Sequence, residues 1–199
     1  MKHSDSNDLR SRDLCFVDIE TTGSTFGYHE IIEIAVIRTS RDDFSDRNKW
    51  VKRIRPQHPE RISPEAQILN GFNELEWHAA EASTAELWMH FAEFVRGSVP
   101  VCHNPSFERA FISLTASAHG ILDLGLDYHW IGTESMAWPL YVCGLIPTLS
   151  LDALCRFYNL PPESYPHTAL EGARACLRVY SAFMGQFAKT LPESHIPRR

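Results

Sequence analysis

Three short apolar segments near the N-terminus have the pattern of strands. Residues 14–20 (LCFVDIE) form a run of branched and aromatic residues that ends in two acids. Residues 31–40 form a similar run, and a third begins at residues 50–56, after the polar stretch DDFSDRNK. Short apolar runs that are bounded by turn residues indicate buried strands. The first third of the chain is therefore predicted to form a three-stranded meander.

The rest of the chain alternates helical patterns with short strand-like runs. A helix is predicted over residues 63–71, with Ser63 as its N-cap, Pro64 as its first residue and Gly71 at its end. Strands and helices that alternate in this way predict an α/β fold with a mixed sheet covered by helices. Apolar spacing predicts further helices over 83–96, 105–120, 149–160 and 168–191, a strand within 98–104, and a strand end leading into a helix within 130–140.

The length and the two ends of the chain predict one domain. The 199 residues are 44% hydrophobic and 22% charged, which is ordinary for a globular protein with a core. We expect a disordered lead-in over residues 1–12, a single domain over 13–190 and a flexible tail over 191–199. The polar N-terminus lacks the apolar stretch of a secretion signal, and no apolar run is long enough to cross a membrane. No membrane partner is expected.

Cysteine usage and net charge narrow the classes of function. No C-x-x-C pair occurs, so neither a disulfide framework nor a zinc site is predicted. Thiols in apolar segments indicate a reducing compartment, and we expect a cytoplasmic location. The net charge of −6 argues against a protein that coats duplex nucleic acid through a basic face. A nuclease that grips a few terminal nucleotides through metal ions does not need such a face. The five cysteines are Cys15, Cys102, Cys143, Cys155 and Cys176.

Asp18 and Glu20 are the first candidates for chemistry. They stand two residues apart on a predicted strand, so both carboxylates point to the same face. Two acids at a buried strand edge repel each other and lose solvation, which is costly unless a cation lies between them. Mg²⁺ and Mn²⁺ prefer such oxygen ligands. The alternative is a polar strand end that carries a chance pair of acids.

Several blocks of the sequence, in a fixed order, resemble the motifs of one family. VDIETTG, at residues 17–23, resembles the Asp-x-Glu-Thr motif of the DnaQ-like 3′-to-5′ exonucleases of the DEDDh type. VCHNPSFERAFI, at 101–112, resembles their second motif, and HTALEGARA, at 167–175, resembles their third. IRPQHPERISPEAQILNG and LSLDALCRFYNLP resemble segments that precede these motifs. The resemblance implies an α/β, ribonuclease H-like three-layer fold with a mixed central sheet flanked by helices.

The resemblance also implies a mechanism. Two divalent cations, Mg²⁺ or Mn²⁺, would clamp the scissile phosphate of a single-stranded DNA or RNA 3′ end, and nucleoside 5′-monophosphates would be released. Asp18 would bind both cations, Glu20 would bind one, and His167 would act as the general base. Polymerases or other repair and processing proteins are the expected protein partners.

The substrate contacts follow from the same resemblance. The terminal nucleotide would face Thr21, Thr22 and Gly23, with Asn104 nearby. Phe107 would stack or wedge against a base, which is a sequence-tolerant way to hold a single strand. The alternative for Phe107 is an ordinary place in the core.

Two positions depart from the family pattern. Glu108 stands where the second motif has Asp, which keeps the charge and adds one methylene. Gly172 stands where the third motif has Asp, so one metal ligand is absent. Glu171 is the nearest substitute, although on a helix it points about 100° away from position 172. The chain is therefore expected to be either a weakened or Mn²⁺-dependent exonuclease or, alternatively, a catalytically inactive domain that binds nucleic acid or a partner protein.

Overall fold

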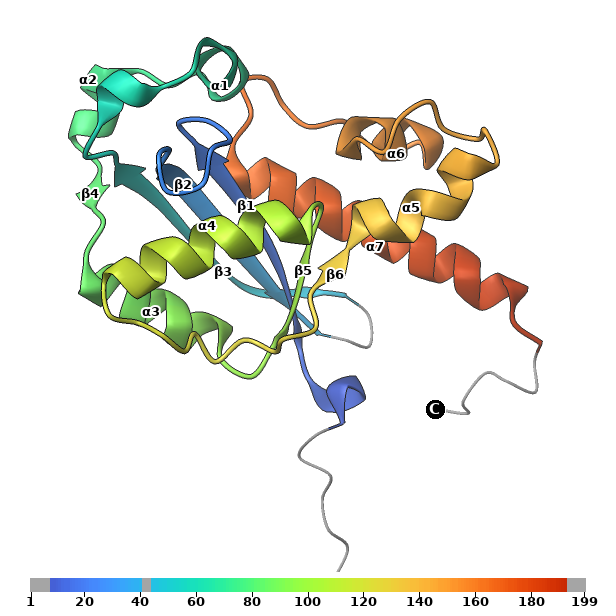
Figure 1. The fold of residues 1–199 in the computed structure, drawn as a ribbon. Helices are drawn as coiled ribbons and strands as arrows, with labels where there is room; N and C mark the ends of the chain where they lie inside the picture. The colour runs from blue at the N-terminus through green and yellow to red at the C-terminus, as the bar shows by residue number, and fades with distance from the viewer. Residues whose placement is uncertain (1–7, 41–43, 193–199) are drawn as a thin grey trace, which may run out of the picture.

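A mixed sheet of six strands forms the centre of the computed structural model, which describes residues 8–40 and 44–192 (Figure 1). The strand order is β4-β3-β2-β1-β5-β6. β1 (Leu14–Thr21), β2 (Ile31–Thr39) and β3 (Asp46–Arg55) form an antiparallel meander. The predicted mixed α/β sheet is confirmed. The parallel pairs are β5 (Val99–Cys102) with β1, β6 (Ile131–Gly132) with β5, and β4 (Glu81–Ala82) with β3.

The helices begin and end largely where the capping residues predict. Ser63 accepts a hydrogen bond from the Ala66 backbone N–H at the start of α1, and Gly71 ends α1 in the left-handed conformation, with φ of 67°. α2 and β4 were not predicted, because each is too short to show a period. The helices are α1 (Pro64–Asn70), α2 (Glu74–His78), α3 (Ala85–Val95), α4 (Pro105–Ala118), α5 (Thr133–Val142), α6 (Leu151–Phe157) and α7 (Ala169–Thr190).

The third strand is longer than its apolar pattern predicts. It begins at Asp46 rather than at residue 50. Its first half is polar, yet Asn48 and Lys49 are paired with Arg38 and Ile37 of β2. Pairing with β2 therefore extends this strand beyond the segment whose side chains are apolar.

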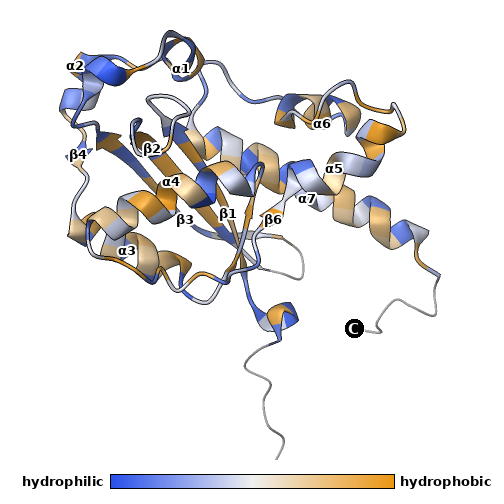
Figure 2. Cartoon of the chain, viewed as in Figure 1, coloured by the Kyte–Doolittle hydropathy of each residue, from blue (hydrophilic) through white to orange (hydrophobic). Residues whose placement is uncertain are grey.

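Successive side chains along β1 point alternately into two hydrophobic cores, one on each face of the sheet. Cys15, Val17 and Ile19 pack against one helical layer, formed by α3 and α4. Leu14 and Phe16 point to the other face, where α7 covers the sheet. Figure 2 shows the apolar strands between these layers. α5 and α6 pack on α7 through a further cluster that includes Ile146, Leu154 and Val179. Asp18 and Glu20 continue the α7-facing register of β1.

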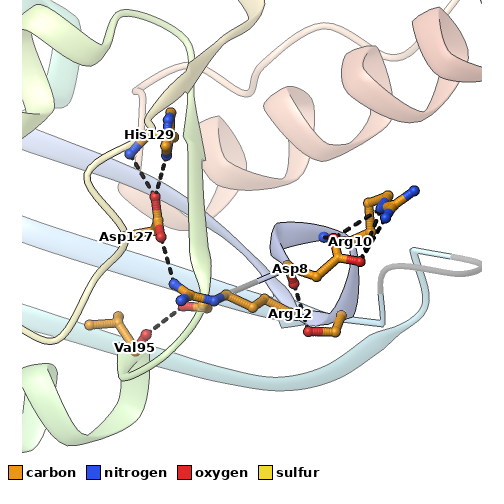
Figure 3. Close-up of polar contacts among 8 residues, drawn as sticks. Asp8, Arg10, Arg12, Val95, Asp127 and His129 are labelled. Carbon is orange, nitrogen blue, oxygen red and sulfur yellow. Dashed lines mark hydrogen bonds and ion pairs between the residues drawn. The ribbon is translucent and has the colours of Figure 1, made fainter. Parts of the chain in front are cut away.

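The residues just before β1 are folded, which corrects the expected lead-in over 1–12 for residues 8–12. Leu9–Ser11 form a 3-10 turn that Asp8 caps. Arg12 Nη1 lies 2.5 Å from Asp127 Oδ2, and the His129 backbone N–H donates to Asp127 Oδ1 at 2.8 Å (Figure 3). These contacts tie the start of the chain to the segment before β6, because Asp127 bridges both.

The remaining expectations about the ends fall mostly outside the described residues. Residues 1–7 of the lead-in and residues 193–199 of the tail lie outside them. α7 ends at Thr190, and Leu191 is its C-cap. Within the described part of the chain, no helix is both long enough and apolar enough to cross a membrane.

Candidate active site

β1 ends in two carboxylates that face α7. Asp18 and Glu20 lie on the same side of the strand as Phe16, as their spacing predicts. Desolvation, together with the nearby charges of Glu20 and Glu108, raises the pKa of Asp18 well above its usual range. Burial, with the charge of Glu33, raises the pKa of Glu20 to about 8. These shifts mean that the two ionised carboxylates are held at a cost in folding free energy.

Glu33 is an acid that the sequence analysis did not select. It stands opposite Glu20 in the β1–β2 ladder and is 5% exposed. Burial raises the pKa of its carboxyl, while Arg53, at 3.8 Å, partly compensates its charge. An acid inside the apolar run IIEIAVI was the available signal, but only strand pairing shows that it lies opposite Glu20.

Glu108 enters the site from the first turn of α4. Its side chain is nearly buried, with the residue 4% exposed, and Oε2 has no hydrogen-bond partner. Burial raises its pKa to about 7. Asn104 caps α4 by accepting a hydrogen bond from the Ser106 backbone N–H at 3.1 Å. The structure thus brings Glu108 to Asp18, and it gives Asn104 a capping role beside its predicted substrate contact.

Gly172 lies directly against Asp18. A Cβ atom built on Gly172 would lie 2.3 Å from Asp18 Oδ2 and 2.6 Å from Cγ. Such a distance is too short for any real contact, so the Asp18 carboxylate fills the space that a side chain at position 172 would need. The first turn of α7 thus brings its backbone close to Asp18 and supplies no metal ligand at position 172.

Glu171 is turned toward its own helix. Its carboxylate forms an ion pair with Arg174, one turn further along α7. Asp18 is influenced by four carboxylates, those of Glu20, Glu108, Glu163 and Glu33, and Glu171 is not one of them. The structure therefore does not bring Glu171 to Asp18, and its predicted role as a substitute ligand stays a prediction.

His167 lies just before α7, in the segment that follows α6. Its backbone N–H donates to the Leu69 carbonyl of α1 at 2.9 Å. Its ring Nδ1 lies 3.8 Å from Glu163 Oε1. Glu163 was missed by the sequence analysis, because nothing in the segment PPESYP marks it as facing the acids of β1. Both Asp18 and Glu20 are influenced by its charge, so this segment lies on the wall of the same site.

The turn after β1 is held by its own hydrogen bonds. Thr21 Oγ1 donates to the Gly23 carbonyl at 2.7 Å, and Thr22 Oγ1 accepts from the Glu30 backbone N–H at 2.9 Å. Both threonines are buried. A Cβ on Gly23 would lie 2.6 Å from the His29 ring, so glycine is needed for this close approach. The hydroxyls of this turn are thus engaged internally, which favours its backbone for any contact with a nucleotide.

Phe107 belongs partly to the core and partly to the surface. Its ring packs on Phe111, with centroids 4.8 Å apart, and it is only partly buried. Phe26, from the turn after β1, is 48% exposed and lies 6.2 Å from Phe107, centroid to centroid. Phe26 was not predicted, because a single aromatic residue in a turn has no periodic signal. Together the two rings form an aromatic edge between the turn after β1 and α4.

Comparison with known proteins agrees with this arrangement. Residues 15–180 match a family model, RNase_T, that is described as exonuclease. The chain belongs to the DnaQ-like 3′-to-5′ exonuclease family. The matched range spans the positions of the predicted catalytic residues, whose roles stay predictions. The resemblance of the sequence motifs to this family is therefore confirmed.

Relatives share the domain, within much longer proteins. The chain is 27% identical over 186 residues to a PolC-type DNA polymerase III of Thermotoga maritima, covering 92% of this chain and 13% of that protein. A PolC-type DNA polymerase III of Caldanaerobacter subterraneus is 29% identical over 163 residues, covering 82% of the chain and 11% of the relative. The chain thus spans about an eighth of the length of these relatives or less.

Solved structures show the same fold at low identity. E. coli exonuclease I in complex with a dT13 oligonucleotide has a TM-score of 0.73 at 16% identity, covering 90% of this chain and 41% of that one. The nuclease domain of 3′hExo, a DEDDh family member bound to rAMP, has a TM-score of 0.65 at 17% identity, covering 87% and 92%. The ribonuclease H-like class of the exonuclease fold is thereby confirmed.

The carboxylate oxygens of this site are of the chemical type that a hard divalent cation prefers. Asp18, Glu20 and Glu108 offer carboxylate oxygens, and the buried Glu108 Oε2 has no partner. In residues 8–40 and 44–192, however, no three side chains of His, Cys, Asp or Glu form a ready metal-holding group. The three carboxylates would have to converge around an ion, and Gly172 brings no fourth.

Proposed function

We propose that this exonuclease domain hydrolyses single-stranded nucleic acid from its 3′ end and releases nucleoside 5′-monophosphates. The observation that carries the proposal is the desolvation of Asp18, Glu20 and Glu108 at one end of the sheet. This desolvation raises the pKa of each carboxyl, and the charges of Glu20 and Glu108 raise that of Asp18 further. Unmatched buried acids cost folding free energy, and a bound cation offsets that cost. Such a site supports catalysis of phosphate transfer better than it supports structure.

The residues divide the work as follows. Asp18, Glu20 and Glu108 would hold Mg²⁺ or Mn²⁺, and a bound divalent cation polarises a phosphodiester and stabilises negative charge on it. His167 takes a proton from the attacking water. The water oxygen then bonds to phosphorus, the bond from phosphorus to O3′ breaks, and solvent protonates the leaving O3′. The backbone of residues 21–23 and the ring of Phe107 hold the terminal nucleotide.

Gly172 leads us to propose one well-held cation where the family pattern implies two. Gly172 supplies no fourth carboxylate, and its close contact with Asp18 leaves no room for a side chain at that position. Hydrolysis is then slow or depends on Mn²⁺. The same observation favours a second candidate function, a domain that binds nucleic-acid ends without cleaving them.

The known structures and relatives support a substrate and a partner. E. coli exonuclease I was solved with a dT13 oligonucleotide, and the sequence relatives are DNA polymerases. We therefore propose single-stranded DNA as the first substrate to test and a polymerase or other repair or processing protein as the partner. RNA is the second substrate, because 3′hExo was solved with rAMP. The unpaired thiols of all five cysteines support a reducing, cytoplasmic setting.

The test is a cleavage assay on 5′-labelled single-stranded DNA and RNA, with Mg²⁺, Mn²⁺ or chelator. A metal-dependent ladder that shortens from the 3′ end and is absent in Asp18→Ala supports the nuclease. Binding measured by fluorescence anisotropy, without cleavage under any metal, supports the second candidate. Calorimetric titration with Mn²⁺ counts the ions: one site supports the single-cation arrangement, and two sites contradict it.

A further inference from the structure

Two hydrogen bonds, one from Tyr165 and one from His167, fasten the segment between α6 and α7 to α1. The Tyr165 hydroxyl donates to the Ile68 carbonyl at 2.6 Å, and the His167 backbone N–H donates to the Leu69 carbonyl at 2.9 Å. The Tyr165 ring stands edge-on to the His167 ring, with an interplanar angle of 84°. These contacts fix the backbone of the segment, so that the direction of the imidazole depends on what its ring nitrogens meet.

Glu163 is the acid that meets this imidazole. Its Oε1 lies 3.8 Å from His167 Nδ1, which is within ion-pair distance but too long for a hydrogen bond. The Glu163 side chain is 14% exposed and that of His167 is 28% exposed, so water screens the pair only in part. Arg178 Nη2 donates to the Pro161 carbonyl at 3.4 Å and holds the start of the same segment.

Other charged groups near Glu163 do not replace this contact. Burial raises the pKa of Glu163, while the charges of His167 and Arg178 oppose that effect. Asp152 and Glu171 repel Glu163, and each has its own arginine partner, Arg156 and Arg174. Among the described residues, His167 is the basic side chain that lies within ion-pair distance of Glu163. Its interaction with this ring is therefore the one that matters most for the site.

We propose that Glu163 is a positioning residue for His167, a role that rests on the proposed nuclease function. A carboxylate beside Nδ1 favours the tautomer that carries its proton on Nδ1, which leaves Nε2 free to accept a proton from water. Once Nε2 holds that proton, the ring is positively charged, and Glu163 stabilises the charge. The proton afterwards leaves to solvent.

The absence of an acid at position 172 gives this role more weight. An aspartate there would place a negative charge at the start of α7, five residues after His167. Gly172 has no charge, whereas Glu163 places one on the same wall, where both Asp18 and Glu20 are influenced by it. Glu163 thus maintains a negative potential around the base without serving as a metal ligand.

Kinetics test the catalytic side of this proposal. We expect Glu163→Gln to lower kcat by about 10- to 100-fold while KM stays unchanged. Losses of this size are typical when the carboxylate partner of a functional histidine is removed. Glu163→Gln combined with His167→Ala should be no slower than His167→Ala alone, because both changes remove one unit. Glu65→Gln, which removes an exposed acid of α1, is the matched control and should cleave like the wild type. Additive losses in the double variant would overturn the proposal.

Nitrogen-15 NMR of the imidazole rings, with His167 assigned from His167→Ala, tests the contact without any need for activity. We expect the Nδ1–H tautomer to predominate in the wild type and to decline in Glu163→Gln at the same pH. An unchanged tautomer, or an unchanged kcat in an active enzyme, overturns the proposal. A wild type that cleaves nothing overturns the nuclease function instead, and the spectra then still decide whether Glu163 orients the ring.

Discussion

The two ends of the central sheet hold their acids differently. Where β1 begins, Asp13 accepts a hydrogen bond from Arg38 Nε at 2.9 Å, and Asp127 pairs with Arg12 at 2.5 Å. Where β1 ends, Asp18 lies near the charges of Glu20 and Glu108. Within the described residues, no Lys, Arg or His forms an ion pair with any of these three carboxylates.

This difference separates structure from function. A carboxylate that is paired with a cationic side chain helps to stabilise the fold. Removing the partner of a buried charge is strongly destabilising. Unmatched acids at the other end reduce folding stability, and such a cost is common where a site is built to bind an ion. The paired end therefore holds the chain together, and the unpaired end is the place to look for chemistry.

The largest expected effect is on activity at the unpaired end. Asp18→Asn keeps the shape of the side chain and removes the charge, so we expect the rate of 3′-end cleavage with Mn²⁺ to fall by about a thousandfold or more. Single-turnover assays on 5′-labelled DNA measure it. Asp123→Asn, the same change on the exposed loop after α4, should cleave normally. Equal rates for the two variants would remove Asp18 from the chemistry.

A smaller loss is expected when the space at Gly172 is filled. Gly172→Ala places a Cβ too close to Asp18 Oδ2, so the carboxylate must move, and displacing a catalytic group by about 1 Å lowers rates by about 100-fold. Gly185→Ala, in the same helix, meets nothing within 4 Å and is the matched control. We expect Gly185→Ala to keep full activity and to gain about 0.5–1 kcal/mol of stability. A Gly172→Ala variant as active as Gly185→Ala would contradict the close contact.

The comparison also predicts that Asp18→Asn gains stability although it loses activity. In chelator, Asp18→Asn should stabilise the protein by about 1–2 kcal/mol, because it removes an unmatched charge. Mn²⁺ should raise the Tm of the wild type, through binding to the folded state, and should not raise that of the variant. Thermal unfolding with and without Mn²⁺ measures both. A destabilised variant in chelator would mean that the acids of this end are matched after all.

The smallest effect is expected at the paired end. Burial acts to raise the pKa of Asp127, but hydrogen bonds from His129 and the charge of Arg12 outweigh it, so that the pKa lies below its usual value. A carboxylate with a depressed folded pKa contributes stability above its unfolded pKa, near 4, and this contribution is lost as the pH falls through the folded pKa. Asp127→Asn should therefore cost about 1 kcal/mol at pH 7.

Urea unfolding at pH 7 and in acid checks this last prediction. The difference between Asp127→Asn and the wild type should shrink as the pH falls below about 4, since the wild-type carboxylate is then protonated. Cleavage activity should stay that of the wild type. A difference in stability that is independent of pH would show that Asp127 acts through packing rather than through charge.

Much of the site could be predicted because it depends on local pattern. The two-residue spacing of Asp18 and Glu20 places them on one face of any strand, and the motif order assigned Glu108 and His167 to the same site. The capping of α1 by Ser63 and Gly71 is likewise local. The short elements α2 and β4 could not be predicted, because they exist through contacts with β3 rather than through a pattern of their own.

What the sequence by itself determined is the order of the longer strands and helices, the family motifs and the missing acid at Gly172. Only the tertiary structure decided how the site accommodates that gap. Asp18 rests on the Gly172 backbone, Glu171 turns to Arg174, and Glu163 reaches His167 from an unpatterned segment. The physical reason is that a period of two or 3.6 residues fixes which face a side chain takes. Which distant groups meet across that face depends on how the elements pack.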